Sequence, residues 1–269
     1  MFSKPVRILE IFGFQIRVDP SWLLIAALVV WTLSGSYFPA KVPGLRPGDY
    51  LGLGLVAAAA FFGGLILHEL AHSLVARRFG LKVGGITLFI FGGVAELDEE
   101  PASARSEFWI AIAGPVMSLA LAAICWLAHL TLEATDVSPP VLAVLDYLAL
   151  INLVLAVFNL LPAFPLDGGR VLRAALWQRS GDILVATRQA TMISEFLAYG
   201  LMTIGLVALF FGNTAGGLWQ VLIAFFLLSA GRATYQQLVM KLALGKRTVA
   251  SMMTRDPMVT IPDDTLAQV

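Results

Sequence analysis

Residues 50–76 read YLGLGLVAAAAFFGGLILHELAHSLVA, an apolar run that carries the polar group His68-Glu69-Leu70-Ala71-His72 near its end. An α-helix needs about 20 predominantly apolar residues to cross the roughly 30 Å of hydrocarbon in a bilayer, and this run is long enough. Two imidazoles and a carboxylate are costly inside a membrane, so their presence there indicates a functional site. The run therefore predicts a membrane-spanning helix that carries chemistry.

The composition of the whole chain agrees with this stretch. Of 269 residues, 58% are hydrophobic and 13% are charged, whereas soluble domains contain about 25% charged residues. The formal net charge is zero, which gives no reason to expect nucleic acid as a partner. The single cysteine, Cys125, cannot form an intrachain disulfide. We expect an α-helical polytopic membrane protein.

Six apolar runs are each long enough to cross a bilayer. We place the spans at about Ser21–Phe38, Tyr50–Ala76, Phe108–Leu130, Val141–Leu161, Thr191–Phe211 and Gly217–Leu238. Lysine and arginine are distributed very unequally between the two sides of these spans, because the loops on one side hold only Lys41 and Arg46 of the 18 basic residues. Basic residues concentrate on the cytoplasmic side of membrane proteins. The pattern predicts a multi-pass protein of the plasma membrane with both termini cytoplasmic.

Two shorter segments favour β-structure instead. The stretch 82–97 is too short and too rich in glycine for a span, and its alternating Ile86, Leu88 and Ile90 predict a β-hairpin. Such a hairpin is tolerated at membrane depth only where protein covers its edges. Residues 8–18 are β-branched and aromatic around Gly13, which predicts two short strands or a hairpin.

The spacing of His68 and His72 suits a metal ion. Four residues separate them, so both imidazoles lie on one helical face about one turn apart. Glu69 stands next to the first histidine, in a position to accept a proton from a metal-activated water. The residues thus predict two metal ligands with a neighbouring general base.

A tetrahedral zinc site with an open position needs a third protein ligand. The carboxylates within apolar sequence are Asp146, Asp167 and Glu195. Asp167 is favoured because it ends the segment NLLPAFPLDGG at 159–169, in which prolines terminate a span and glycines permit unusual backbone angles. The alternative is that Asp167 only caps the helix expected at 168–179. For Glu195 the alternatives are a helix cap, an ion pair with Arg188 and a place beside a substrate entrance.

HELAH on one span and NLLPAFPLDGG after another resemble the site-2 protease family of intramembrane zinc metalloproteases. Within that family the chain is similar to the bacterial and archaeal branch with a C-terminal CBS domain, which includes the sporulation factor processing enzyme. The resemblance covers essentially the whole chain, including the Ala113-Gly114-Pro115 start of the third span. It implies six transmembrane helices with a small membrane-dipping β-sheet, and it implies hydrolysis of peptide bonds in membrane-spanning substrate proteins.

The resemblance also assigns roles to individual residues. It implies one zinc ion held by His68, His72 and Asp167, with Glu69 as the catalytic general base. Asn159 matches an asparagine that engages substrate or stabilises the oxyanion. The hairpin glycines Gly92 and Gly93 are expected to bind an unwound substrate through strand pairing.

Asn152 lies seven residues before Asn159 and so shares its helical face. A position along the substrate groove and an interhelical hydrogen bond are equally good interpretations of this residue. We retain Asn152 as a candidate substrate-binding residue.

These expectations divide the chain into residues 1–242, the six-helix metalloprotease domain, and residues 243–269, a linker with the start of a CBS domain. The resemblance implies that the full-length protein binds an adenine nucleotide and forms a homo-oligomer through its CBS domains, whereas only the opening of that domain is present here. Two other functions are alternatives to a metalloprotease. A metal-ion transporter would distribute its ligands along a path, and a non-catalytic scaffold for membrane proteins would not need Glu69.

Overall fold

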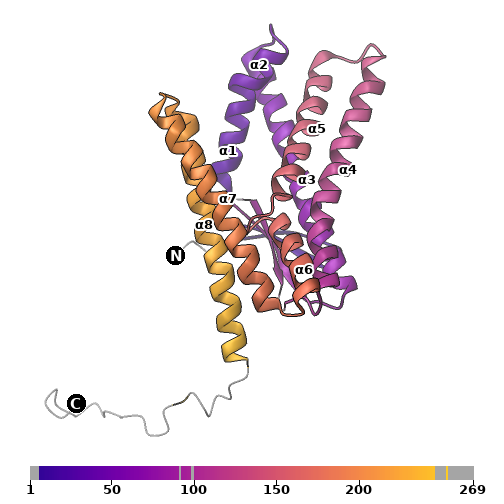
Figure 1. Cartoon of the computed structure of the whole chain (residues 1–269). Coiled ribbons are helices and arrows are strands. Elements are labelled where there is room, and N and C mark those ends of the chain that lie inside the picture. Colours follow the sequence, from indigo (N-terminus) through magenta and orange to yellow (C-terminus); the bar gives the residue numbers. More distant parts are fainter. Residues whose placement is uncertain (1–5, 91, 98–99, 246–252, 254–269) are drawn as a thin grey trace, which may run out of the picture.

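The computed structural model describes residues 6–90, 92–97, 100–245 and 253. Within this part, six helical segments are long and apolar enough to cross a membrane, and they correspond to the six expected spans (Figure 1). They are α1 (Trp22–Thr32) continued by η1 (Leu33–Tyr37) and α2 (Phe38–Lys41), α3 (Pro47–Arg78), α4 (Ala104–Glu133), α5 (Pro139–Asn159), α7 (Ile183–Phe210) and α8 (Thr214–Leu244). The short helix α6 (Asp167–Ser180) follows the proline-containing loop, as expected.

Local sequence explains where several of these helices begin and end. Proline, which fits the first turn of a helix because it needs no backbone donor there, opens both α3 and α5. Asp182 caps α7 by accepting hydrogen bonds from the backbone N–H groups of Leu184 and Val185. Gly181 ends α6 in the left-handed conformation, with φ of 72°.

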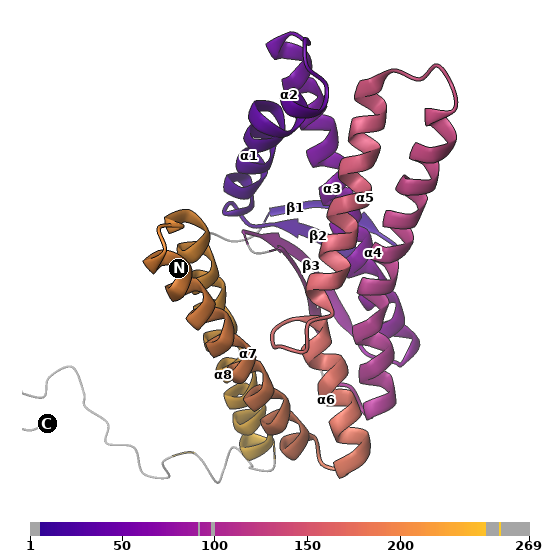
Figure 2. The same ribbon diagram turned by 45° about the horizontal axis from the view of Figure 1, so that its top comes forward.

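The strands β1 (Val6–Ile11), β2 (Phe14–Val18), β3 (Val83–Phe89) and β4 (Gly92–Leu97) form one sheet in the order β1-β2-β3-β4 (Figure 2). Both expected hairpins are confirmed as antiparallel pairs. The pairing of the two hairpins into one sheet was not predicted. It is formed by β2 and β3, which pair in parallel, with Ile16 opposite Ile86. These two isoleucines are buried against Leu70 of α3, so the sheet is fixed to the helix that carries HELAH.

The remaining packing brings distant helices to that same region. α4 packs against α3, α5 and α6, while α7 packs against α6 and α8. In both views the α7–α8 pair stands apart from α4 and α5 (Figures 1 and 2). A buried ion pair between Glu107 of α4 and Arg173 of α6 fixes α6 beside α4. The short helix α6 therefore lies between α4 and α7, both of which it contacts. The expected start of a CBS domain lies almost wholly outside the described residues, apart from Met253.

Candidate metal centre

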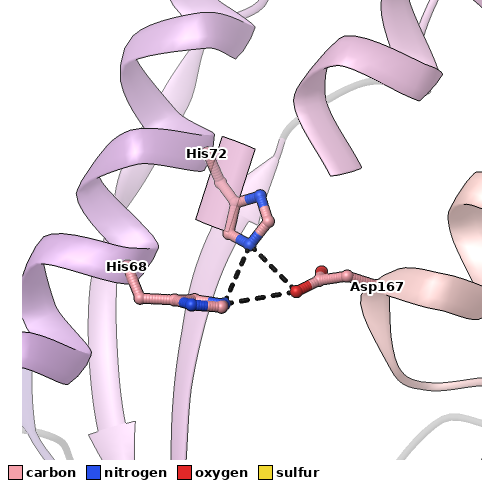
Figure 3. Close-up of side chains that lie close together, drawn as sticks. All are labelled: His68, His72 and Asp167. Atoms are coloured by element: carbon pink, nitrogen blue, oxygen red, sulfur yellow. Dashed lines mark hydrogen bonds and ion pairs between the residues drawn. The ribbon is translucent and has the colours of Figure 1, made fainter. Parts of the chain in front are cut away.

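His68, His72 and Asp167 point toward one another from α3 and from the first residue of α6 (Figure 3). The Nε2 atoms of the two histidines are 3.2 Å apart, and each lies 3.2 Å from Asp167 Oδ2. All three residues are buried. In the part of the chain that the structure describes, this is the one cluster of His, Cys, Asp and Glu with the spacing of a metal site.

The triangle has the dimensions that zinc requires. Zn²⁺ binds nitrogen and oxygen at about 2.0–2.2 Å in tetrahedral geometry, which separates neighbouring ligand atoms by about 3.3 Å. The donor set, two imidazoles and a carboxylate, is the kind found in catalytic zinc sites that keep one position open. The residues present therefore fit this metal.

One face of α4 completes the centre. The Nδ1 atom of His72 lies 2.6 Å from the carbonyl oxygen of Ile110, and because a carbonyl only accepts, Nδ1 carries the hydrogen. The Nδ1 atom of His68 lies 2.8 Å from the hydroxyl of Ser118. Partners of this kind orient a ligating imidazole and leave its Nε2 lone pair available to a metal. Both histidines are thus held with Nε2 facing the cluster.

Gly114 lies between these two positions on α4, one turn from each. A Cβ atom built there would collide with the Nε2 atoms of His72 and His68. The missing side chain leaves the space in which a metal ion would lie. Gly114, which in the sequence is only a glycine before a proline, is therefore part of the site.

Asp167 is held in place by contacts from two other helices. The Ser194 hydroxyl of α7 accepts a hydrogen bond at 2.8 Å from the backbone N–H of Phe164, in the loop before Asp167. Asp167 is the first residue of α6, and about two turns further along this helix the ion pair between Arg173 and Glu107 anchors it to α4. Burial raises the pKa of Asp167, but the His72 and His68 imidazoles lower it by more, so its pKa lies below the usual range. These contacts hold the Asp167 carboxylate with Oδ2 directed at the histidine pair.

A pocket of about 200 Å³ opens onto the cluster, and it brings together most of the expected site residues. Its lining includes Glu69, Asn159 and Gly93 together with His68, His72 and Asp167. A Cβ at Gly93 would lie only 2.6 Å from Glu69 Cγ, so the glycine allows β4 to pass directly against this glutamate. The side-chain nitrogen of Asn159 donates to the Leu155 carbonyl at 2.9 Å.

Two expected substrate-binding residues do not line this pocket. Gly92 opens β4 without reaching it. Asn152 is buried and lines a separate apolar pocket with Gly64 and Cys125, and its amide donates to the Leu148 carbonyl at 2.8 Å. Their proposed contact with substrate stays a prediction.

Sequence reasoning missed several residues of the site. Val94, Ile110, Pro165 and Arg170 complete the pocket lining. Arg170 follows Asp167 by three residues, so helical spacing alone places it on the same face. Ser118 and the Ile110 carbonyl had no recognisable signal, since one is a small residue among many and the other is a backbone group.

The fold and the site together define a class: a multi-pass membrane protein with a buried His–His–Asp centre suited to a zinc ion. The sequence profile described as Peptidase family M50 matches residues 56–138 and 133–203. The chain belongs to this peptidase family.

Individual proteins agree with this membership. The chain is 38% identical to Rip3 of Mycobacterium tuberculosis over 248 residues, covering 92% of this chain and 63% of that protein. It is 40% identical over 232 residues to sll0528 of Synechocystis, covering 84% of this chain and 58% of that protein. The chain thus spans less than two thirds of the length of these relatives.

A solved structure supports the same conclusion. The site-2 protease from Methanocaldococcus jannaschii matches with a TM-score of 0.56 and 28% identity, covering 86% of this chain and 94% of that one. The resemblance of HELAH and NLLPAFPLDGG to site-2 proteases is confirmed, as is the fold of six membrane helices with a small sheet.

Proposed function

We propose that this chain is an intramembrane zinc metallopeptidase that hydrolyses peptide bonds of membrane-spanning proteins. The observation that carries the proposal is the triangle of His68, His72 and Asp167 ligand atoms, each 3.2 Å from the next, with Glu69 lining the same pocket. Membership of family M50 supports the class of reaction.

His68, His72 and Asp167 would hold one zinc ion per chain. When bound, zinc polarises a carbonyl group and makes water more acidic, which is the chemistry that peptide hydrolysis needs. Ser118 and the Ile110 carbonyl keep the two imidazoles oriented for this role.

Glu69 is the group that moves the proton. Its carboxylate accepts a proton from the attacking water, whose oxygen bonds to the carbonyl carbon of the scissile peptide. The C–N bond then breaks, and Glu69 delivers the proton to the leaving nitrogen, so that the products are a carboxylic acid and an amine, between which one further proton passes to give a carboxylate and an ammonium group. Asn159 lines the same pocket, and we assign it to hydrogen bonding with the substrate carbonyl as negative charge develops there.

The substrate enters as an extended strand beside β4. A helical substrate shields its carbonyls, and unwinding it leaves its backbone groups without partners. β4 is an edge strand of the sheet, and its Gly93 and Val94 line the pocket. Pairing with this edge would satisfy the substrate backbone and hold the scissile bond extended near the zinc ligands.

We further propose the orientation that the basic residues predict, with both termini on the cytoplasmic side of the plasma membrane. A thiol label that reached an Asn213→Cys variant, made in a Cys125→Ala background, from the cytoplasmic face would contradict it. Nucleotide binding and oligomerisation through CBS domains stay predictions for the full-length protein.

The direct test is a Glu69→Gln variant of the purified chain with a single-span substrate in a bilayer. Glutamine keeps the size of the side chain but cannot accept the proton, so cleavage should fall by about 10²–10⁴-fold. The zinc content should stay at one per chain. An Asp167→Ala variant should instead lose both zinc and cleavage. Undiminished cleavage by zinc-loaded Glu69→Gln protein would refute the proposed mechanism.

A further inference from the structure

A second polar pocket lies in the groove between α7 and α8 and shares no lining residue with the metal centre. Its volume is about 190 Å³, and it is lined by Arg188, Thr191, Met192, Glu195, Arg232, Tyr235 and Gln236. On α7 these residues recur at spacings of three and four, so they occupy one helical face, and those on α8 do the same. The pocket is therefore a product of the pairing of the two helices.

The pocket carries one uncompensated positive charge. Arg232 donates from Nε to Glu195 at 2.7 Å and from Nη2 to the Tyr199 hydroxyl at 2.9 Å. Glu195 thus pairs with Arg232 and not with Arg188, which was one of the alternatives for this residue. Arg188 makes no hydrogen bond or ion pair with any other residue that the structure describes. The free guanidinium makes the pocket attractive to an anion.

A hydroxyl group lies beside this charge. Thr191 is 7% exposed, and its hydroxyl has no hydrogen-bond partner among the described residues. Tyr235 and Gln236 add further polar groups from α8. Phosphate oxygens accept hydrogen bonds from guanidinium and hydroxyl groups alike.

The position of the pocket along the helices indicates the source of such an anion. It lies toward the start of α7 and the end of α8, on the side where basic residues concentrate. Arg188 comes five residues after the first residue of α7, or about 8 Å along the helix. The expected span of this helix begins three residues later, at Thr191, so Arg188 lies at the edge of the hydrocarbon, beside the region of the phospholipid headgroups.

The surface deeper along the same faces is apolar and open to lipid. Tyr199 follows Glu195 by one turn and is 48% exposed, and Phe225 precedes Arg232 by two turns and is 65% exposed. A phospholipid has the matching polarity, with a charged phosphate at the interface and acyl chains below it.

We propose that this pocket binds the phosphate group of an anionic phospholipid, with Arg188 and Arg232 contacting the phosphate and the acyl chains lying over Tyr199 and Phe225. The location gives the lipid a link to the metal centre. Ser194, which holds the loop before Asp167, lies on α7 between Thr191 and Glu195. A lipid bound here would contact the same turn of α7.

The test measures lipid binding to the detergent-solubilised chain with tail-labelled phosphatidylglycerol. Phosphatidylcholine and inorganic phosphate serve as competitors. Phosphatidylglycerol should bind at least about fivefold more tightly than phosphatidylcholine, because one basic residue near a membrane surface is worth about a fivefold preference for anionic lipid. Arg188→Gln should lose that preference, and because Arg188 has no partner among the described residues, the variant should fold like the parent.

Two further variants separate lipid binding from a structural role. Glu195→Gln removes the carboxylate that competes with the lipid phosphate for Arg232, so this variant should bind phosphatidylglycerol more tightly. If the pocket served only to join α7 and α8, loss of the Arg232 ion pair would instead weaken the packing of the two helices. Arg179→Gln, an exposed arginine on α6, is the matched control and should leave the preference unchanged.

Three outcomes would overturn the proposal. They are equal binding of the two lipids, an unchanged preference in Arg188→Gln, and displacement of phosphatidylglycerol by millimolar inorganic phosphate, which would assign the pocket to the free ion. None of these measurements depends on peptide cleavage, so they stand or fall separately from the proposed peptidase activity.

Discussion

At the scale of single residues, the metal centre depends on a side chain that is missing. Ile110, Gly114 and Ser118 follow one another at single-turn spacing along α4, and they supply a carbonyl, a space and a hydroxyl to the histidine pair. The two outer positions orient the imidazoles. The central position keeps the volume between the Nε2 atoms open.

A Gly114→Ala variant should therefore lose zinc. The added Cβ would overlap the Nε2 atoms of both histidines, so we expect zinc affinity to fall by more than about tenfold, the effect commonly seen when the surroundings of metal ligands are disturbed. Metal analysis after dialysis against a graded chelator measures this.

Gly63→Ala is the matched control, because it is also a helical glycine and a Cβ there would have no neighbour within 4 Å. Full zinc occupancy in Gly114→Ala at the chelator concentration that the parent tolerates would show that the space is not required.

The sequence could predict the parts of the site that depend on local spacing. His68 and His72 share a helical face in any regular helix, and Asp167 follows a loop marked by two prolines. The ion pairs between helices could not be predicted from the sequence. Glu107 finds its partner 66 residues later in Arg173, and Glu195 finds its partner 37 residues later in Arg232. Such pairs depend on how helices pack, and no local pattern encodes that.

At the scale of secondary-structure elements, the sheet offers its β4 edge to the metal pocket. Val94 is 47% exposed and lines that pocket. A Val94→Pro variant removes one backbone N–H from the edge, and if that group pairs with substrate, cleavage should fall by at least about tenfold while zinc content stays unchanged. Cleavage of a membrane substrate and metal analysis on the same sample measure both.

Val94→Ala keeps the backbone N–H and serves as the control, so it should cleave nearly as well as the parent. Parental activity in folded, zinc-loaded proline variants throughout 87–94 would show instead that the hairpin fills space and does not bind substrate.

The two hairpins of the sheet were predictable because alternation and glycine breaks are local signals. Their parallel union was not. Ile16 and Ile86 lie on different hairpins separated by two spans, and the strand pattern of each is compatible with several partners. The position of β4 at the edge, on which substrate pairing depends, follows only from this union.

At the scale of the whole molecule, the six spans could be located from hydropathy alone, but their neighbours could not. In lipid, a helix face that meets another helix and a face that meets acyl chains are both apolar, so composition does not distinguish them. The sequence therefore does not predict that α7 and α8 stand apart from α4 and α5, as the structure shows.

The metal centre joins positions that are 99 residues apart in the chain, His68 and Asp167. A zinc ion bound there would act as a reversible crosslink between the first and second halves of the protein. Because it binds the folded chain and not the unfolded one, zinc at about 1,000 times its dissociation constant would add about 4 kcal/mol to the free energy of unfolding. A chelator should therefore lower the unfolding temperature of the parent by several degrees and leave an Asp167→Ala variant unaffected. Equal shifts in the two proteins would show that Asp167 takes no part in the crosslink. If the crosslink holds, the protein's resistance to heat and proteolysis would vary with the zinc supply of the cell, so metal limitation would reduce the amount of protein as well as its activity.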